Sequence, residues 1–163
     1  MLGVLNVMTF LTLPLKHEYR SFEDNVVEDF YIPVLQRSVR YDRAVGFFSS
    51  TSLIEITRGL SGLIKNNGTI RLIVSPNLSE EDIEAIAYGY KNKREVIETK
   101  LLSVFETEFN IFQKKRLNLL AHLISNGILN IKIALIEDCK GIGIFHDKLG
   151  IVEDKEGNHI AFS

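Results

Sequence analysis

Short apolar segments with the composition of β-strands alternate along this chain with longer segments that carry a helical period. The strand-like segments cover residues 43–48, 69–75, 129–136, 143–152 and 158–163, and the helical segments cover 23–38, 53–66 and 80–126. This alternation favours an α/β layered domain, because each helix carries the chain back so that the next strand can pair in parallel. A short hairpin joins the last two strands, so we expect a mixed, largely parallel sheet with helices on both faces.

The helical segments are recognised by their apolar spacing and by residues that begin or end helices. Phe22, Val26, Phe30 and Val34 recur every four residues, which places them on one helical face. Ser21 is a suitable N-cap for that helix.

The other helix boundaries are predicted from capping patterns. The stretch Ser52–Glu55 has the form of a capping box and predicts the start of the second helix. Asn66-Asn67-Gly68 predicts the end of that helix and a turn. We expect the third helical segment to break near Gly89 and Lys93 and to end at Gly127.

The composition is that of one ordinary globular domain. The 163 residues are 45% hydrophobic and 25% charged, and we treat residues 1–163 as a single domain. A formal net charge of −2 indicates no general basic surface, so any nucleic-acid binding would depend on a local patch. Cys139 is the only cysteine, which excludes an intrachain disulfide and favours a reducing, cytoplasmic location.

Residues 2–15 form an apolar run near the start of the chain. No basic residue precedes the run and no small-residue cleavage site follows it, which disfavours a signal peptide. The run is also shorter than the about 20 residues that cross a membrane. We therefore expect a buried strand or an edge segment there, and no membrane association.

The strongest functional signal is the tripeptide His146-Asp147-Lys148. Side chains two residues apart in a strand project from the same face, so His146 and Lys148 would lie side by side. Lysine supplies a compact positive charge for phosphate oxygens. Histidine titrates near neutral pH and can serve as a nucleophile or as an acid–base group. The pair therefore suits attack on a phosphate ester.

The residues around this tripeptide resemble the phospholipase D superfamily. The signature of that family is His-x-Lys, four residues, an acidic residue and then Gly-Ser-x-Asn on the next strand. His146 and Lys148 match the signature, and Glu153 stands where the family usually has Asp. The Gly-Ser-x-Asn element would begin at or just after Ser163, which suggests that the chain is a fragment of something longer.

Three further stretches, residues 30–35, 41–50 and 68–76, resemble the phospholipase D-like nuclease modules that are fused ahead of superfamily II (DEAD/DEAH-type) helicases. Together with the His-x-Lys region, the resemblance covers roughly residues 19–163. It implies a phospholipase D-like layered domain, a nuclease activity on DNA and a helicase elsewhere in the same protein. ATP and Mg would serve only that separate helicase domain, and no cofactor is expected in this one.

The resemblance also implies a role for each site residue. His146 would be the nucleophile that forms a phosphohistidine, and Lys148 would neutralise charge on the non-bridging oxygens. Glu153 follows His146 at an odd offset, so on an unbroken strand it faces away from the phosphate and would orient the site. Asp154 would take over if a bulge shifts the register. The chemistry would be independent of metal, and no residue cluster in the sequence has metal-ligand spacing.

One His-x-Lys motif is half of such a site, because the family pairs two histidines. The other histidines, His17, His122 and His159, are not followed by lysine two residues later. The second motif would therefore come from another copy of the chain in a C2 homodimer, or from sequence beyond Ser163. In both cases we expect the isolated chain to be weak or inactive as an enzyme.

Two other features have a functional and a simpler interpretation. Ser49 and Ser50 follow a predicted strand and open a helix, where hydroxyls and free N–H groups can hold a phosphate, although helix capping explains them equally. Basic residues between Lys91 and Arg116 could form a face for a nucleic-acid backbone. Glutamates interleave with them, which favours a solvated, salt-bridged surface.

These observations favour a metal-independent DNA phosphodiesterase that acts through His146. The main alternative is a non-catalytic module that binds DNA or dimerises, with His146 vestigial. A lipid phosphodiesterase is disfavoured, because the sequence has no signal peptide, no amphipathic membrane helix and no strong basic patch. A doubly wound signalling domain would need an acidic phosphoacceptor pocket, which the sequence does not offer.

Overall fold

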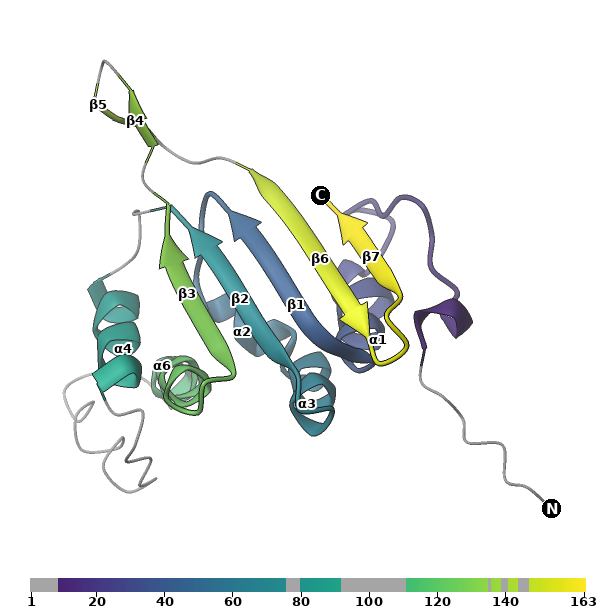
Figure 1. Ribbon diagram of the computed structural model, residues 1–163, viewed down its shortest axis with the longest axis horizontal. Coiled ribbons are helices and arrows are strands. Elements are labelled where there is room, and N and C mark those ends of the chain that lie inside the picture. Colours follow the sequence, from purple (N-terminus) through teal and green to yellow (C-terminus); the bar gives the residue numbers. More distant parts are fainter. Residues whose placement is uncertain (1–8, 76–79, 92–110, 135, 139–140, 144–146) are drawn as a thin grey trace.

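The computed structural model describes residues 9–75, 80–91, 111–134, 136–138, 141–143 and 147–163 (Figure 1). Its helical elements are η1 (Phe10–Thr12), the π-helical η2 (Val27–Tyr31), α1 (Ile32–Leu35), α2 (Ser50–Glu55), α3 (Thr57–Lys65), α4 (Glu80–Lys91) and α6 (Ile111–Ser125). Its strands are β1 (Ser38–Val45), β2 (Thr69–Val74), β3 (Leu129–Ile133), β4 (Ile136–Asp138), β5 (Gly141–Gly143), β6 (Lys148–Asp154) and β7 (His159–Phe162).

Five of these strands form the main sheet, in the order β3-β2-β1-β6-β7. Strands β1, β2 and β3 are parallel, because helices connect them, whereas β6 pairs antiparallel with both β1 and β7. The strands β4 and β5 pair with each other in a separate antiparallel ribbon. The expected α/β domain with a mixed sheet is confirmed.

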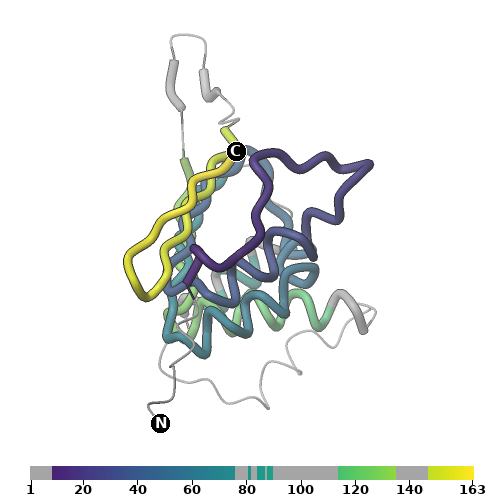
Figure 2. The backbone as a smooth tube through the Cα atoms, turned by 90° about the vertical axis from the view of Figure 1, so that its right-hand side faces the viewer, coloured from purple at the N-terminus to yellow at the C-terminus, as the bar shows by residue number. Residues whose placement is uncertain are grey.

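The described helices cover one face of the main sheet. Figure 1 shows α1, α2, α3 and α6 behind the strands, and Figure 2 shows the helical layer on one side of the sheet. In β2, Ile70, Leu72 and Val74 are buried, while Thr69, Arg71 and Ile73 alternate with them and are exposed. Such strict alternation is the pattern of a sheet packed on one side only. The expectation of helices on both faces is therefore not met within the described ranges.

The core lies between this covered face and the helices. Helix α6 contributes most to it, because five of its side chains are buried in this core. Its fully buried side chains include Leu117, Leu120, Leu123 and Ile124. Val34 and Leu35 of α1 and Leu60 and Leu63 of α3 complete this layer on the same face of the sheet.

The first predicted helix, over residues 23–38, is wrong in its extent. The chain forms η2 and then only one turn of α1, and β1 already begins at Ser38. Pro33 stands in the first turn of α1, where its missing N–H is tolerated. The strand predicted over 43–48 therefore starts too late. Only Ser38 and Tyr41 of β1 are buried, and the charges at positions 40, 42 and 43 hid this strand in the sequence.

The second helix begins earlier than the predicted 53–66 and is divided. Ser49 is the N-cap of α2, and its side chain accepts a hydrogen bond from the N–H of Thr51 at 3.2 Å, so the capping box at Ser52–Glu55 is wrong. The residue Ile56 has φ −96° and ψ 12° and separates α2 from α3. The predicted turn at 66–68 is confirmed, and Asn67 takes the left-handed conformation with φ 57°.

The third helical segment is confirmed at both ends. Helix α4 begins at Glu80, and α6 ends before Gly127, whose φ is 72°. A break near Gly89 is wrong, because Gly89 lies inside α4 and a Cβ there would come within 2.8 Å of Ile124 Cβ. Gly89 thus permits close packing of α4 on α6. The break expected near Lys93 lies outside the described residues.

The remaining strands occur in the predicted order, but the boundaries of some of them differ from the prediction. Strand β2 matches 69–75, and β7 matches 158–163. The strand predicted over 129–136 corresponds to β3, which ends earlier, at Ile133. The strand predicted over 143–152 corresponds to β6, which covers 148–154. Within the apolar run 2–15, residues 9–15 contain the short helix η1 and no strand, so the strand predicted there is wrong for the described part.

A cluster of aromatic rings fastens β7 to the covered face. The ring of Phe162 lies 4.8 Å from that of Phe30 and 5.7 Å from that of Tyr31, both edge to face. Phe162 pairs across the strands with Gly150, and a Cβ at Gly150 would come within 2.2 Å of Phe162 Cζ. Glycine is required at this position because the ring lies directly over it.

We predict that Gly150→Ala lowers the free energy of unfolding by about 1–3 kcal/mol, because the packed Phe162 ring cannot move away from the new methyl group. Urea denaturation followed by circular dichroism measures the change. Adding Phe162→Leu should recover part of the loss in a double-mutant cycle. Equal stability of Gly150→Ala and the parent would contradict this packing.

Candidate functional site

The carboxyl ends of β1, β2 and β3 lie together at one edge of the sheet, and Lys148 lies at the same edge. This follows from the antiparallel pairing of β6 with β1, which places Lys148 opposite Val45. The N–H of Gly46 donates to the carbonyl oxygen of Asp147 at 3.1 Å and continues the pairing past the strand. In open α/β sheets, ligands bind at the carboxyl ends of parallel strands.

Of the two residues of the His-x-Lys motif, the structure describes Lys148 but not His146. Lys148 is exposed and begins β6, as a phosphate-binding lysine requires. His146 lies outside the described residues, so the predicted pairing of His146 with Lys148 stays a prediction. By strand alternation, Lys148 shares the covered face of β6 with Gly150 and Val152.

Glu153 projects from the opposite, open face of β6. Its carboxylate lies 3.6 Å from the guanidinium of Arg40 and 3.4 Å from Nε2 of His159. Five residues of extended chain, about 17 Å, separate it from Lys148. This geometry agrees with the expectation that Glu153 faces away from the phosphate, and its supporting role stays a prediction.

Asp154 is the acidic residue that the fold depends on. It is fully buried, and its carboxylate accepts hydrogen bonds from the N–H of Phe10 and the hydroxyl of Thr9, both at 2.8 Å. The N–H groups of Glu156 and Asn158 donate to its other oxygen at 3.0 and 2.9 Å. The carboxylate thus fastens the N-terminal segment and closes the turn between β6 and β7.

These contacts also set the charge of Asp154. Burial raises the pKa of the carboxyl group, but hydrogen bonds from Phe10, Asn158 and Thr9 outweigh it and lower the pKa to about 2. The bulge by which Asp154 would replace Glu153 is not found in β6; the extra residue is Val39 of β1, because Ser38 pairs with Asp154 while Arg40 pairs with Glu153. The run of β6 is continuous, so Asp154 supports the fold more than 17 Å from Lys148.

Ser49 and Ser50 differ in what they can contact. The side chain of Ser49 caps α2, as the simpler interpretation expected. Ser50 is fully buried, and its hydroxyl has no hydrogen-bond partner within the described ranges. Ser49 therefore lies at the start of α2 beside the carboxyl edge, while Ser50 faces the interior.

Arg116 fixes the helices behind this turn, a role that the sequence did not reveal. Its Nη1 donates to the hydroxyl of Thr51 at 3.2 Å, and its Nη2 donates to the carboxylate of Glu81 at 2.9 Å. One guanidinium thereby joins α6 to α2 and α4. The contact agrees with the salt-bridged interpretation of the basic residues, of which Lys93, Arg94 and Lys100 lie outside the described part.

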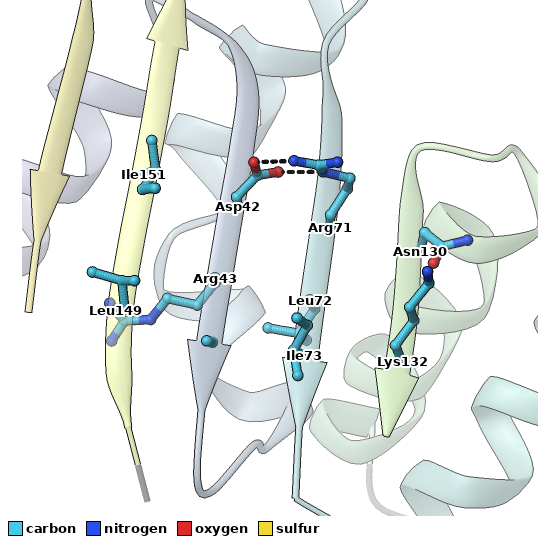
Figure 3. Close-up of a pocket in the computed structure, with 10 residues that line it drawn as sticks. Asp42, Arg43, Arg71, Leu72, Ile73, Asn130, Lys132, Leu149 and Ile151 are labelled. Atoms are coloured by element: carbon cyan, nitrogen blue, oxygen red, sulfur yellow. Dashed lines mark hydrogen bonds and ion pairs between the residues drawn. The ribbon is translucent and has the colours of Figure 1, made fainter. Parts of the chain in front are cut away.

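The open face carries a shallow groove of about 340 Å³ (Figure 3). Arg71 of β2 forms two hydrogen bonds with Asp42 of β1, and Arg40 donates to the same carboxylate at 2.8 Å. Burial raises the pKa of Asp42, but the hydrogen bonds from both arginines outweigh it and hold the pKa low. Leu149 and Ile151 form the apolar side of the groove and are 47% and 37% exposed.

The described residues contain no group of three or more His, Cys, Asp or Glu side chains that could hold a metal ion. None of the helices in the described ranges is long and apolar enough to span a bilayer.

Comparison of the chain with protein-family models, with curated proteins and with solved structures finds no match. The site is therefore interpreted from its own residues.

The neighbouring acids Glu153 and Asp154 provide a matched test of this assignment. We predict that Asp154→Asn lowers the free energy of unfolding by roughly 2–4 kcal/mol, because an amide presents an N–H to buried donors. Glu153→Gln should change it by less than about 0.5 kcal/mol, since its ion pairs are partly exposed. Thermal denaturation at neutral pH measures both, and a larger loss in Glu153→Gln would contradict the assignment.

Stability should also depend on pH through Asp154. The folded-state pKa of about 2 lies below the ordinary 3.8, so the unfolded chain takes up the proton more readily. The stabilisation is therefore complete above about pH 5 and is lost as the pH falls towards 2. Denaturation measured between pH 6 and pH 2 should show a shallower decline in stability for Asp154→Asn than for the parent.

Proposed function

We propose that this domain is a metal-independent phosphodiesterase that cleaves DNA through a phosphohistidine on His146. The observation that carries the proposal is the position of Lys148. It is exposed, it begins β6, and it lies opposite Val45 at the carboxyl edge of the parallel strands. A cation at this edge is suitably placed for a phosphate, and His146 precedes it by two residues.

The proposed chemistry has two steps. In the first, an imidazole nitrogen of His146 attacks phosphorus, a P–N bond forms, and the P–O bond to the leaving nucleoside breaks. A second histidine donates the proton that the leaving oxygen takes up. In the second step, water attacks phosphorus with that histidine as base, and the P–N bond breaks. Lys148 neutralises charge on the non-bridging oxygens in both steps.

The proposal includes the setting of the domain. The α/β sheet would be a phospholipase D-like layered domain, forming the N-terminal part of a larger cytoplasmic, helicase-associated protein. The helicase would open or translocate on DNA, and this domain would cut it. The position of Lys148 at the carboxyl edge of the parallel strands supports this proposal, and ATP and Mg would belong to the helicase domain alone.

The second histidine is supplied in this proposal by a second His-x-Lys motif. It comes from another copy of the chain across a two-fold axis, or from sequence beyond Ser163. Among the described residues, His122 lies in α6 and His159 lies on the opposite end of β6 from Lys148, paired with Glu153. Neither of these two histidines is placed to act beside Lys148.

A non-catalytic role is the second candidate, and one observation favours it. Leu149, Ile151 and Ile73 are exposed together on the open face of the sheet, where apolar side chains usually have a covering partner. A module that only dimerises or grips DNA would use such a surface without His146. Cleavage and binding must therefore be measured separately.

We predict that the protein continued past Ser163 nicks DNA in the presence of EDTA, and that His146→Ala lowers the rate by at least about 10³-fold. DNA binding by the variant should persist, because the nucleophile contributes little to ground-state affinity. Lys148→Gln should lower the rate by roughly 10²–10³-fold. Gel assays of supercoiled plasmid measure nicking, and fluorescence anisotropy measures binding.

Two surface substitutions provide the matched controls. His159→Ala removes an exposed histidine at the far end of the sheet, and Lys155→Gln removes an exposed lysine in the turn after β6. Both should cleave DNA like the parent. Binding without cleavage in all variants and the parent would favour the non-catalytic module, and cleavage that survives His146→Ala would contradict the proposed nucleophile.

A further inference from the structure

A cavity of about 220 Å³ lies between the covered face of the sheet and the helices η2 and α2. Four aromatic side chains line it: Tyr31, Tyr41, Phe47 and Phe48. Phe47 is 71% exposed, so this ring stands where the cavity meets solvent. Ser52 and Glu55 of α2 add polar groups to the lining. Aromatic walls with a small number of polar groups are typical of pockets that accept a flat organic group.

Arg43 is the one cation among the described residues that line this cavity. Its Nη1 atom is buried and has no hydrogen-bond partner within the described part of the chain. The guanidinium lies 5.2 Å from the ring centre of Phe162. The ring contacts the flat face of the cation and gives its N–H groups no hydrogen-bond acceptor. A buried guanidinium N–H without an acceptor costs free energy, and an acceptor from a ligand would remove that cost.

The strand register connects this cavity with Lys148. Arg43 pairs with Gly150 and Val45 pairs with Lys148, so all four residues share the covered face. Val45 also lines the cavity. Arg43 and Lys148 are therefore two pairs apart along the strands, about 7 Å by the rise of extended chain. A phosphate at Lys148 and a base beside Arg43 can belong to one nucleotide.

We infer that this cavity holds one unpaired nucleobase of the DNA strand whose phosphate lies at Lys148, an inference that rests on the proposed function. The base stacks on the aromatic walls, and Arg43 donates hydrogen bonds to its edge. Guanine presents O6 and N7 side by side, which a guanidinium contacts through two N–H groups, so guanine fits best. Only an unstacked base can enter, so the site selects single-stranded or extruded nucleotides.

The inference is tested by binding, without cleavage. The protein continued past Ser163 and carrying His146→Ala is titrated in EDTA with short single strands of abasic residues. Each strand carries one guanine, one adenine or no base, and fluorescence anisotropy gives the affinity. The guanine strand should bind about ten-fold tighter than the strand without a base, and the adenine strand should lie between them.

Two arginine variants distinguish recognition of the base in the cavity from a general attraction of DNA to positive charge. Arg43→Met should abolish the preference for guanine while the protein stays folded, because the Nη1 atom makes no hydrogen bond that the variant loses and only the contact with the Phe162 ring is removed. Arg40→Met removes a partly exposed arginine on the opposite face and should keep the preference. A guanine preference that persists in Arg43→Met would overturn the inference.

The two proposals fail in different ways. Equal affinity for the guanine strand and the strand without a base would contradict the pocket, even if the parent protein nicks DNA. A guanine preference in a parent protein that never nicks DNA would support the pocket and contradict the phosphodiesterase.

Discussion

The pairing of β1 on both of its sides is the constraint on which the rest of the structure depends. On one side β1 runs parallel to β2, so the carboxyl ends of the parallel strands meet at one edge. On the other side it runs antiparallel to β6, so the first residue of β6 comes to that same edge. Lys148 and Val45, far apart in the sequence, become neighbours only because the central strand carries both kinds of pairing.

The parts of the fold that the sequence predicted well have local causes. Strand β2 is rich in β-branched residues and follows a turn, and Gly127 supplies the positive φ after the end of α6. These features need no knowledge of what packs against them, so periodicity and turn chemistry were sufficient.

The parts that the sequence did not predict depend on contacts between distant residues. Strand β1 carries charges at positions 40, 42 and 43, and it is a strand because β2 and β6 supply its hydrogen bonds. The role of Asp154 depends on the N–H of Phe10, which no spacing rule connects with it. Arg116 and the stack of Arg43 on Phe162 were missed for the same reason.

The register of β1 and β6 gives the two faces of the sheet different chemistry. Residues 149, 151 and 153 face the open side, where Glu153 joins the surface ion pairs around Arg40. Residues 148, 150, 152 and 154 face the covered side, where Lys148 and Gly150 adjoin the Arg43 cavity and Asp154 is buried. The extra residue Val39 keeps Ser38 opposite Asp154, so both polar side chains are buried together. A shift of one residue would exchange the faces, so the unbroken run of β6 keeps Lys148 on the same side of the sheet as the buried carboxylate of Asp154.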